Sequence, residues 1–441
     1  MTNDRPKPGY QQTEVGVIPD DWETSPLSEK ARVIDSLHKT PNFCESGYPM
    51  VRVADIKPGN LRLDETLKVS DAVFEEFTRN YKPKRGDIVL SRVGSYGVSS
   101  FVETDEPFCL GQNTVVIESK VPSRFLYYAL NANYIREQIE DGSYGSGYKS
   151  LSLKNIKELT VALPSTISEQ EKLAQALSDV DALIAALDKA IDKKRAIKTA
   201  TMQQLLTGKK RLLGFGEGKG YQQTAIGSIP EDWEAKLLPK IAWFQEGPGL
   251  RNWQFTTQGT KVINVTNLEN GILNLDRTDR HITIEEFLKT YSHFAIDCGD
   301  IVMASSGNSY CKTAVVRDCD LPLVMNTSVI RFKPVNGYNY TFLFLYLKSD
   351  LFKNQIDLMI TGGAQPNFGP YHLRKVFLPV PSSDEQLAIA TVLSDMDAEI
   401  AALETRLAKT QSIKQGMMQQ LLTGKVRFKV EVSMNAGRED D

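Results

Sequence analysis

Residues 9–23 read GYQQTEVGVIPDDWE, and residues 220–234 read GYQQTAIGSIPEDWE. Eleven of these fifteen positions are identical, and the two stretches lie 211 positions apart in a chain of 441 residues. Because self-similarity at a long fixed period is typical of repeated structural units, the second half of the chain is predicted to restate the first. We refer to the two stretches as the YQQT–DWE motifs. We interpret their tryptophans, Trp22 and Trp233, as packing anchors rather than ligand contacts.

The repeat continues beyond these motifs. Gly86-Asp-Ile-Val89 returns as Gly299-Asp-Ile-Val302, and the sequence MQQLLTGK ends both copies, at 202–209 and 418–425. The stretch near 165–209 is closely copied, whereas the segment between the motif and this stretch matches mainly at apolar and glycine positions. This pattern predicts a fixed scaffold that carries two divergent heads. Two tandem repeats in one chain can close into a pseudo-two-fold object, as a homodimer does.

The copied stretch predicts a long helix. Residues 168–207 contain no glycine or proline, Ser168 opens an S-x-x-E capping box, and Gly208 stands where the helix would stop. The matching helix of the second half is predicted to start after Ser383 and to end before Gly424.

Apolar residues recur along both helices at alternating intervals of four and three, which is the spacing of a heptad seam. The seam residues are Leu173, Leu177, Val180, Ile184, Leu187 and Ile191 in the first copy, and Ile389, Leu393, Met396, Ile400, Leu403 and Leu407 in the second. This seam is narrower than the face by which a helix usually packs on a globular domain, and pseudo-two-fold symmetry favours an antiparallel coiled coil between the copies. We interpret the basic residues toward the helix ends as solvated surface: Lys193, Lys194, Arg195, Lys198, Lys409 and Lys414.

Short apolar runs broken by turns predict strands in both heads. They are residues 48–53, 87–90 and 114–117 in the first head and 261–265, 300–303 and 328–332 in the second, and one amphipathic helical segment follows in each, at 125–139 and 342–356. The predicted fold class is therefore α+β, with two α/β heads and two long helices that pair as an antiparallel coiled coil. The predicted domains are a first head (1–164), a spacer helix (165–210), a second head (211–381), a second spacer helix (382–428) and a flexible tail (429–441).

Two polar, glycine-bearing loops in each head keep their place in the repeat while their sequences differ. The first follows the G-D-I-V strand and offers Ser91, Arg92, Ser95 and Tyr96 in one head, and Ser305, Ser306, Asn308, Ser309, Tyr310 and Lys312 in the other. The second offers Ser143, Tyr144, Ser146, Tyr148 and Lys149, and in the other head Thr361, Gln365 and Asn367; a basic turn adds Lys82, Lys84 and Arg85. Such side chains suit contacts with base edges and phosphates in DNA, although ordinary surface turns share this composition.

Composition and motifs exclude several classes of function. With 52 Lys and Arg against 55 Asp and Glu, the net charge is -3, so the chain is not a polycation that binds nucleic acid by bulk charge. Five cysteines without a C-x-x-C pattern and four scattered histidines predict neither a disulfide framework nor a metal site. The sequence shows no signal peptide, membrane helix, phosphate-binding loop or catalytic constellation, and it therefore predicts a cytoplasmic, non-catalytic protein without a membrane partner.

Together, the duplicated YQQT–DWE motifs, G-D-I-V strands, helix starts and MQQLLTGK endings resemble the specificity subunits of type I restriction-modification enzymes, over residues 9–427. The resemblance implies that each head is a target recognition domain that reads one half of a bipartite, asymmetric target in double-stranded DNA. It implies that two methyltransferase subunits dock on the helices and motifs, and that restriction subunits join through them. It also implies a bacterial or archaeal source and no cofactor in this chain, with S-adenosylmethionine, ATP and Mg on the partners.

Alternatives stay open. The targeting subunit of a methylation-only complex would use the same kind of chain. A pseudo-symmetric coiled-coil scaffold that binds proteins and no nucleic acid is a different class, and a DNA-binding measurement against salt concentration would discriminate it. A self-sufficient adenine methyltransferase is disfavoured, because the sequence lacks an N-P-P-[YF] motif.

Overall fold

The structure is a computed structural model that describes residues 6–142, 150–269, 271–335, 337–360 and 366–428. The chain divides into two compact units: unit 1 comprises residues 1–189 and 404–441, and unit 2 comprises residues 190–403. Each unit holds one head, the start of one long helix and the end of the other. The units thus divide the chain within the helices rather than at their ends, and the boundaries of the five predicted domains stay predictions. The predicted tail, 429–441, lies outside the described residues.

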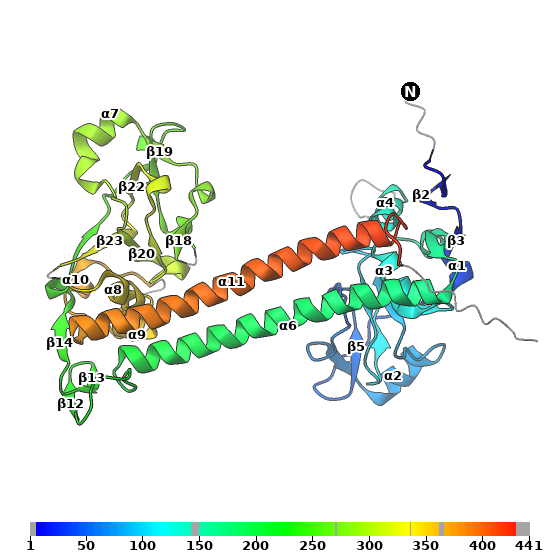
Figure 1. The fold of residues 1–441 in the computed structure, drawn as a ribbon, viewed down its shortest axis with the longest axis horizontal. Coiled ribbons are helices and arrows are strands. Elements are labelled where there is room, and N and C mark those ends of the chain that lie inside the picture. The colour runs from blue at the N-terminus through cyan, green and yellow to red at the C-terminus, as the bar shows by residue number, and fades with distance from the viewer. Residues whose placement is uncertain (1–5, 143–149, 270, 336, 361–365, 429–441) are drawn as a thin grey trace, which may run out of the picture. The chain divides into compact units, whose positions relative to one another are not determined.

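Both long helices form as single elements, α6 (Ile167–Leu206) and α11 (Ser383–Leu421) (Figure 1). Their lengths agree closely with the prediction, but the predicted caps were wrong. The hydroxyls of Thr166 and Ser382, which lie before the predicted caps, accept hydrogen bonds at 3.3 Å from the backbone N–H groups three residues later. Among the described residues, no helix is both long enough and apolar enough to cross a membrane.

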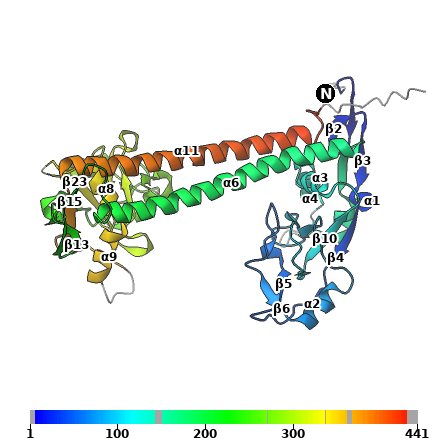
Figure 2. The ribbon, with the colours of Figure 1, turned by 60° about the horizontal axis from the view of Figure 1, so that its bottom comes forward.

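In unit 1, the start of α6 lies antiparallel to the end of α11 (Figure 2). Leu173 and Leu177 share a core with Leu421. Lys414 Nζ lies 2.5 Å from Asp181 Oδ1, across the helix pair. The seam residues of this unit therefore pack both on the other helix and on the head.

In unit 2, the end of α6 lies antiparallel to the start of α11 in the same way. Leu206 and Ile389 share a core, and Lys198 forms an ion pair with Asp397. This ion pair is the repeat counterpart of the Lys414–Asp181 pair, 216 positions away on each helix. The local pairing in each unit therefore has the antiparallel direction that the repeat predicted.

All twelve predicted seam residues are buried or half-buried. The interpretation of the basic residues as solvated surface was wrong for three of them, because Lys194, Lys198 and Lys414 pair with acidic residues of the other helix. Ion pairs that flank an apolar seam fix which helix direction and register are favoured.

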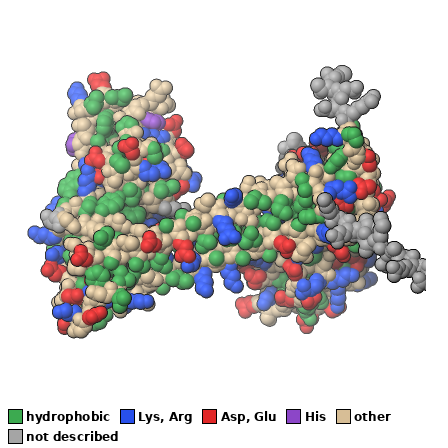
Figure 3. All heavy atoms as spheres, in the orientation of Figure 1, with side chains coloured by type: hydrophobic (Ala, Val, Ile, Leu, Met, Phe, Trp, Pro, Cys, Tyr) green, Lys and Arg blue, Asp and Glu red, His purple; other side chains and the backbone are tan. Residues whose placement is uncertain are grey.

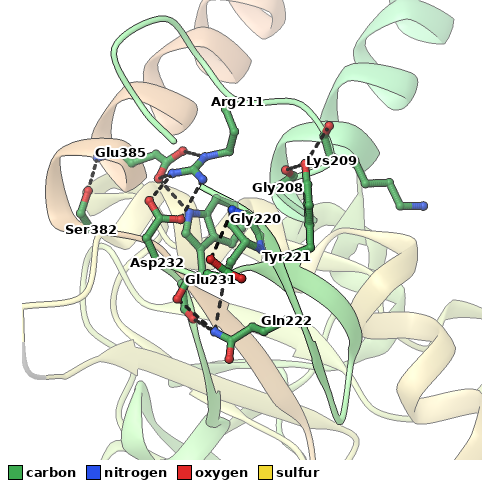
Figure 4. Close-up of polar contacts among 12 residues, drawn as sticks. Gly208, Lys209, Arg211, Gly220, Tyr221, Gln222, Glu231, Asp232, Ser382 and Glu385 are labelled. Atoms are coloured by element: carbon green, nitrogen blue, oxygen red, sulfur yellow. Dashed lines mark hydrogen bonds and ion pairs between the residues drawn. The ribbon is translucent and has the colours of Figure 1, made fainter. Parts of the chain in front are cut away.

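Each YQQT–DWE motif holds the end of one long helix and the start of the other (Figure 4). In unit 2, Arg211 Nη1 donates to Asp232 of the motif at 2.8 Å, and Arg211 Nε donates to Glu385 of α11 at 2.5 Å. Trp233 Nε1 donates to the same Glu385 carboxylate at 2.8 Å, and Tyr221 donates to the backbone oxygen of Gly208 at 3.0 Å. We call this arrangement the unit 2 clamp.

Unit 1 contains an equivalent clamp, except that Trp22 Nε1 has no hydrogen-bond partner among the described residues. Arg427 donates to Asp21 and to Glu169, at 2.8 and 2.7 Å. Tyr10 donates to the backbone oxygen of Gly424 at 3.2 Å. Trp22 and Trp233 are both buried, as expected of packing anchors.

The glycine that ends each long helix has a left-handed backbone, with φ of +68° at Gly208 and +67° at Gly424. A Cβ at Gly208 would lie 2.5 Å from two carbons of Pro230, and a Cβ at Gly424 would clash with Pro19 in the same way. The glycine at each helix end is therefore required for two reasons: the left-handed turn of the backbone and the close approach of the YQQT–DWE motif.

We expect Gly208→Ala to destabilise the chain by about 2–4 kcal/mol, because backbone strain of about 1 kcal/mol adds to the overlap with a buried proline ring. Thermal unfolding monitored by calorimetry measures the loss. Gly416→Ala is the matched control, because Gly416 lies inside α11 with nothing within 4 Å of an added Cβ. Alanine is the better helix former there, so the control should be neutral or stabilising. Equal stability of the two variants would contradict the packing described here.

The head of unit 1 is α+β. Its strands are β1 (Tyr10–Thr13), β2 (Gly16–Pro19), β3 (Trp22–Pro26), β4 (Ala31–Asp35), β5 (Tyr48–Val51), β6 (Leu67–Val69), β7 (Ile88–Ser91), β8 (Ser99–Phe101), β9 (Cys109–Leu110), β10 (Thr114–Ser119) and β11 (Thr160–Pro164). Its helices are α1 (Leu27–Lys30), α2 (Asp71–Thr78), α3 (Ser123–Leu130), α4 (Asn133–Asp141) and α5 (Leu153–Glu158). The main sheet has the antiparallel order β4-β10-β7-β8, and a smaller sheet has the order β6-β5-β9.

Both faces of this main sheet are covered. Leu90 and Val115 face the core that contains α3 and α4, whereas Val89 and Val116 face a second core with Val51. Alternating side chains of a strand point to opposite faces, which is why residues 88–90 and 115–117 of the predicted strands are all apolar.

The head of unit 2 repeats this plan. Its strands are β12 (Tyr221–Thr224), β13 (Gly227–Pro230), β14 (Glu234–Leu237), β15 (Ala242–Glu246), β16 (Thr260–Ile263), β17 (Leu268–Glu269), β18 (Ile272–Leu273), β19 (His281–Ile282), β20 (Ile301–Ala304), β21 (Thr313–Val315), β22 (Leu323–Met325), β23 (Val329–Pro334) and β24 (Phe377–Val380). Its helices are α7 (Ile284–Glu286), α8 (Tyr340–Leu347), α9 (Asp350–Met359) and α10 (Pro370–Leu373). The main sheet has the order β15-β23-β20-β21, which matches β4-β10-β7-β8 strand for strand.

Each predicted helical segment, 125–139 and 342–356, is two helices rather than one. Polar side chains cause the break. Asn131 donates to the backbone oxygen of Tyr127 at 2.7 Å, and the hydroxyl of Ser349 donates to that of Tyr346 at 2.6 Å. Short polar side chains that bond nearby carbonyls compete with the helical hydrogen bonds.

Candidate nucleic-acid interface

Three strand ends meet at one edge of the main sheet in unit 1. Strands β4 and β7 end there and β10 begins there, because β10 lies antiparallel between the other two. Ser36 N–H donates to Thr114 O at 3.2 Å, and Arg92 N–H donates to Asn113 O at 2.9 Å. We call this the loop edge of the first head.

The second predicted loop of the first head also reaches this edge. Val93 and Ser150 form an isolated antiparallel bridge, and Leu151 N–H donates to Arg92 O at 2.8 Å. The structure therefore joins the start of the first predicted loop to the residues that directly follow the second.

The loop edge of the second head is built in the same way from β15, β20 and β23. Ser305 N–H donates to Ser328 O at 2.9 Å. Ser306 and Asn367 form an isolated antiparallel bridge, and Phe368 N–H donates to Ser305 O at 3.0 Å. Both heads thus present two sequence-divergent loops on the same framework.

The candidate residues fall into distinct environments. Seven lie outside the described residues: Ser143, Tyr144, Ser146, Tyr148, Lys149, Thr361 and Gln365. Ser95, Asn308, Lys312 and Asn367 are exposed at the loops, and Tyr96, Ser306, Ser309 and Tyr310 are half-buried.

Two candidates are buried and face the protein. Ser91 donates to the backbone oxygens of Ser95 and Val98, the latter at 3.2 Å, and therefore holds the shape of its own loop. Ser305 is 1% exposed, and its hydroxyl has no hydrogen-bond partner among the described residues. Neither hydroxyl is presented to solvent at the loop edge, which corrects the expectation that both could contact DNA directly.

Arg92 links the first loop to strand β4. Its Nη1 donates to both carboxylate oxygens of Asp35, at 2.9 and 3.1 Å, and its Nε donates to Leu151 O at 3.1 Å. His38 Nε2 lies 3.0 Å from the same carboxylate. Charge-assisted contacts of this kind are stronger than neutral ones, so they stiffen the loop edge of the first head.

Tyr310 belongs to a polar triad in the second head. It donates to Asp357 Oδ1 at 2.6 Å and accepts from Lys353 Nζ at 2.5 Å, while Lys353 Nζ also lies 2.8 Å from Asp357. The hydrogen bonds with Asp357 and Tyr310 raise the pKa of Lys353 above its ordinary value, and this amine stays protonated at neutral pH. The triad ties the first loop of this head to α9.

The basic turn does not present free cations. Lys82, Lys84 and Arg85 pair with Glu75, Glu118 and Asp105 at 3.4, 2.7 and 2.7 Å. The turn and Asp105 line a pocket of about 190 Å³. Because exposed pairs of this kind contribute little, these cations remain available to exchange partners.

A third loop at the edge of the second head was missed by the sequence analysis. Residues 247–253 follow β15, Thr327 Oγ1 donates to Pro248 O at 3.0 Å, and Trp253 is 81% exposed. An aromatic side chain so open to solvent is a candidate for stacking on a base or a sugar. Trp253 lies outside the repeated YQQT–DWE motifs that hold the buried Trp22 and Trp233, and this difference is the only signal that the sequence offers for it.

Charges of both signs are mixed on the face of the heads that Figure 3 shows. Lys and Arg side chains are interspersed there with Asp and Glu. A net charge of -3 is thus not offset by one basic patch on this face.

A model of the type I restriction modification DNA specificity domain matches residues 19–194 and 230–415. The chain belongs to the type I restriction-modification DNA specificity family. Each matched range lies within one copy of the repeat and contains most of one head and most of one long helix. The resemblance and the fold class predicted from the sequence are confirmed, whereas the individual site residues stay predictions.

Similar proteins share the full length of this specificity protein. The type I restriction enzyme MjaVIII specificity subunit of Methanocaldococcus jannaschii is 26% identical over 425 residues, which cover 93% of this chain and 94% of that protein. The EcoBI specificity subunit of Escherichia coli is 22% identical over 434 residues, which cover 93% and 87%.

Solved structures support the same fold. The S subunit of a type I restriction-modification system from M. genitalium has a TM-score of 0.53 at 17% identity, covering 91% of this chain and 96% of that one. A chain from a study of complex assembly and conformational transition of the type I R-M system has a TM-score of 0.56 at 14% identity, covering 93% and 99%.

Proposed function

We propose that the two heads of this DNA specificity protein read two different half-sites of one bipartite, asymmetric target in double-stranded DNA. The supporting observation is the pair of loop edges: one framework of strand ends occurs twice and carries different side chains each time. Where the first head places Arg92, the second places the small, buried Ser305. Side chains that read base edges set sequence preference, so two loop sets imply two half-sites.

The partners follow from what the repeat preserves. The YQQT–DWE motifs and the clamps are nearly identical in the two units, although the heads differ. A surface presented twice in one chain suits two copies of one partner. We assign these surfaces to two methyltransferase subunits, and restriction subunits join through them.

In this assignment the chain itself is non-catalytic and holds no cofactor. S-adenosylmethionine belongs to the methyltransferase subunits, and ATP and Mg belong to the restriction subunits. The complex works on DNA in the cytoplasm of a bacterium or an archaeon. Because the cations of the basic turn are paired and the net charge is -3, we expect the isolated chain to bind DNA weakly, with most of the phosphate contacts supplied by the partners.

Giving the chain two copies of one head tests this proposal. A variant in which residues 235–381 are replaced by a second copy of residues 24–164 should methylate a target whose two halves have the same sequence on opposite strands, because each half is read by its own head. Mapping of methylated adenines by single-molecule sequencing, on DNA treated with the assembled methyltransferase complex, gives the result. An unchanged target sequence would sink the proposal, and DNA binding without any dependence on salt would favour a protein scaffold instead.

A further inference from the structure

One carboxylate at the loop edge of the second head has no partner among the residues that the structure describes. The side chain of Glu246, the last residue of β15, forms no hydrogen bond or ion pair with any of them. Its repeat counterpart in the first head is Asp35, the last residue of β4, which binds both Arg92 and His38. The carboxylate at this position is thus paired with basic side chains in the first head, and in the second head it has no described partner.

Strand register explains the difference. In unit 1, Asp35 and Leu90 both pair with Val115, and Arg92 lies two residues beyond Leu90 on the same face of the sheet. The side chain of Arg92 therefore reaches Asp35.

In unit 2, Glu246 and Met303 both pair with Ile330, and Ser305 lies two residues beyond Met303 on the same face. Ser305 thus occupies the position of Arg92. Its hydroxyl is buried and has no hydrogen-bond partner among the described residues. Among the described residues, the second head therefore holds two polar side chains without a partner where the first has an ion pair.

Leaving the carboxylate of Glu246 open carries a cost. The residue is half-buried, and this burial raises its pKa above the ordinary value of a glutamate. A partly dehydrated acid without a cation destabilises the folded state, and groups of this kind concentrate at functional sites. An acid at a DNA-facing edge also repels phosphates, so it favours binding only where a base offers it a donor.

We propose that Glu246 is a specificity-determining residue of the second head, accepting a hydrogen bond from the exocyclic amino group of a cytosine in the half-site that this head reads. This inference rests on the proposed function. Cytosine presents its N4 amino group in the major groove, whereas guanine presents two acceptors that would repel a carboxylate. Adenine presents an acceptor beside its amino group, which makes it a poorer partner for an acid than for an amide. In the first head, Asp35 is already paired with Arg92, so we expect no such preference for cytosine at the equivalent position.

The test maps methylated adenines for the assembled complex with wild-type chain, Glu246→Ala, Glu246→Gln and Asp318→Asn. We expect Glu246→Ala to reduce discrimination by about tenfold or more at one base pair of one half-site, with the other half-site and the gap unchanged. We expect Glu246→Gln to shift that position toward adenine, which pairs well with an amide. Asp318→Asn is the matched control, because this exposed acid follows β21, which runs away from the loop edge.

Thermal stability separates this role from a structural one. Because burial raises the pKa of Glu246 in the folded state, its ionisation costs stability as pH rises through the unfolded and folded pKa values, and the full cost is present above both. We therefore expect Glu246→Gln to raise the thermal midpoint at pH 7 to 8, and this gain to vanish below about pH 4.

The outcomes are distinct. If the wild-type complex methylates a bipartite target and the Glu246→Ala complex methylates the same target with the same discrimination, this inference is overturned and the proposed function stands. A lower thermal midpoint of Glu246→Gln at neutral pH overturns it as well, because the residue would then be structural. A wild-type complex that methylates no bipartite target overturns both.

Discussion

Arg211→Ala is expected to destabilise unit 2 by about 3–5 kcal/mol, because it leaves a buried carboxylate without its cation. Arg211 donates to Glu385 through Nε and Nη2, at 2.5 and 2.8 Å, and the Glu385 side chain is only 2% exposed. Calorimetric unfolding of the full chain measures the loss. Arg211→Lys keeps the charge but loses the planar fork, so it should lose less than the alanine variant and more than a surface substitution.

Arg427→Ala is the matched change in unit 1. Its partner Glu169 is equally buried, but the Arg427 side chain is 36% exposed against 12% for Arg211. Water therefore compensates part of the loss, and the destabilisation should be smaller. If Arg211→Ala lost less than about 1 kcal/mol, the clamp would be no more than a surface ion pair.

The pH dependence of the clamp follows from Asp232. Its hydrogen bond with Arg211 lowers the pKa of this carboxyl below its ordinary value. A group whose folded pKa is lowered contributes stability above its unfolded pKa and loses it as pH falls through the folded pKa. The difference in unfolding free energy between wild type and Arg211→Ala should therefore have its largest value at pH 5 to 7 and become smaller below about pH 4.

Lengthening both helices by one heptad, between residues 189 and 190 and between residues 403 and 404, is expected to lengthen the gap between the half-sites by about three base pairs. Seven helical residues add about 10 Å, and each base pair adds about 3.4 Å. A whole heptad keeps the seam in register, because both helices run unbroken through these positions. Three base pairs also turn the far half-site by about 100° around the duplex, so methylation should be slower as well as displaced.

Mapping of methylated adenines measures this change too. The control is the same insertion in α6 alone, which shifts one side of the seam against the other and should abolish methylation. A longer gap with both half-sites unchanged supports the spacer role of the helices. An unchanged gap in an active variant with two lengthened helices would refute it.

The sequence predicted what depends on local spacing. The heptad positions from Leu173 to Ile191, the stop at Gly208 and the direction of the helix pair all follow from periodicity and the repeat, and the structure agrees with them. The caps were missed by one or two positions, because Thr166 and Ser382 compete with equally good candidates beside them.

The candidate site was predictable only in outline. The repeat located the loops, but it did not show that Ser91 is turned inward or that Arg92 binds Asp35, 57 positions away. Contacts of that kind depend on the order of strands in the sheet, which the sequence did not supply. The unpaired carboxylate of Glu246 follows from the register of β15 and β23 against that of β4 and β10, which the sequence alone does not show.

The division of the helices between the units has a consequence for synthesis of the chain. Unit 2 is one continuous segment, whereas unit 1 needs residues from both ends, and its clamp joins Asp21 to Arg427 across 406 positions. All the residues of unit 2 are therefore synthesised before residues 404–441, the last part of unit 1, are added to the chain. Until α11 is complete, Leu173 and Leu177 lack part of their apolar cover, and exposed surface of this kind attracts chaperones and aggregation. A chain truncated before residue 404 would thus hold all the residues of unit 2 but an incomplete unit 1, and the exposed surface of unit 1 would direct the whole chain to quality control.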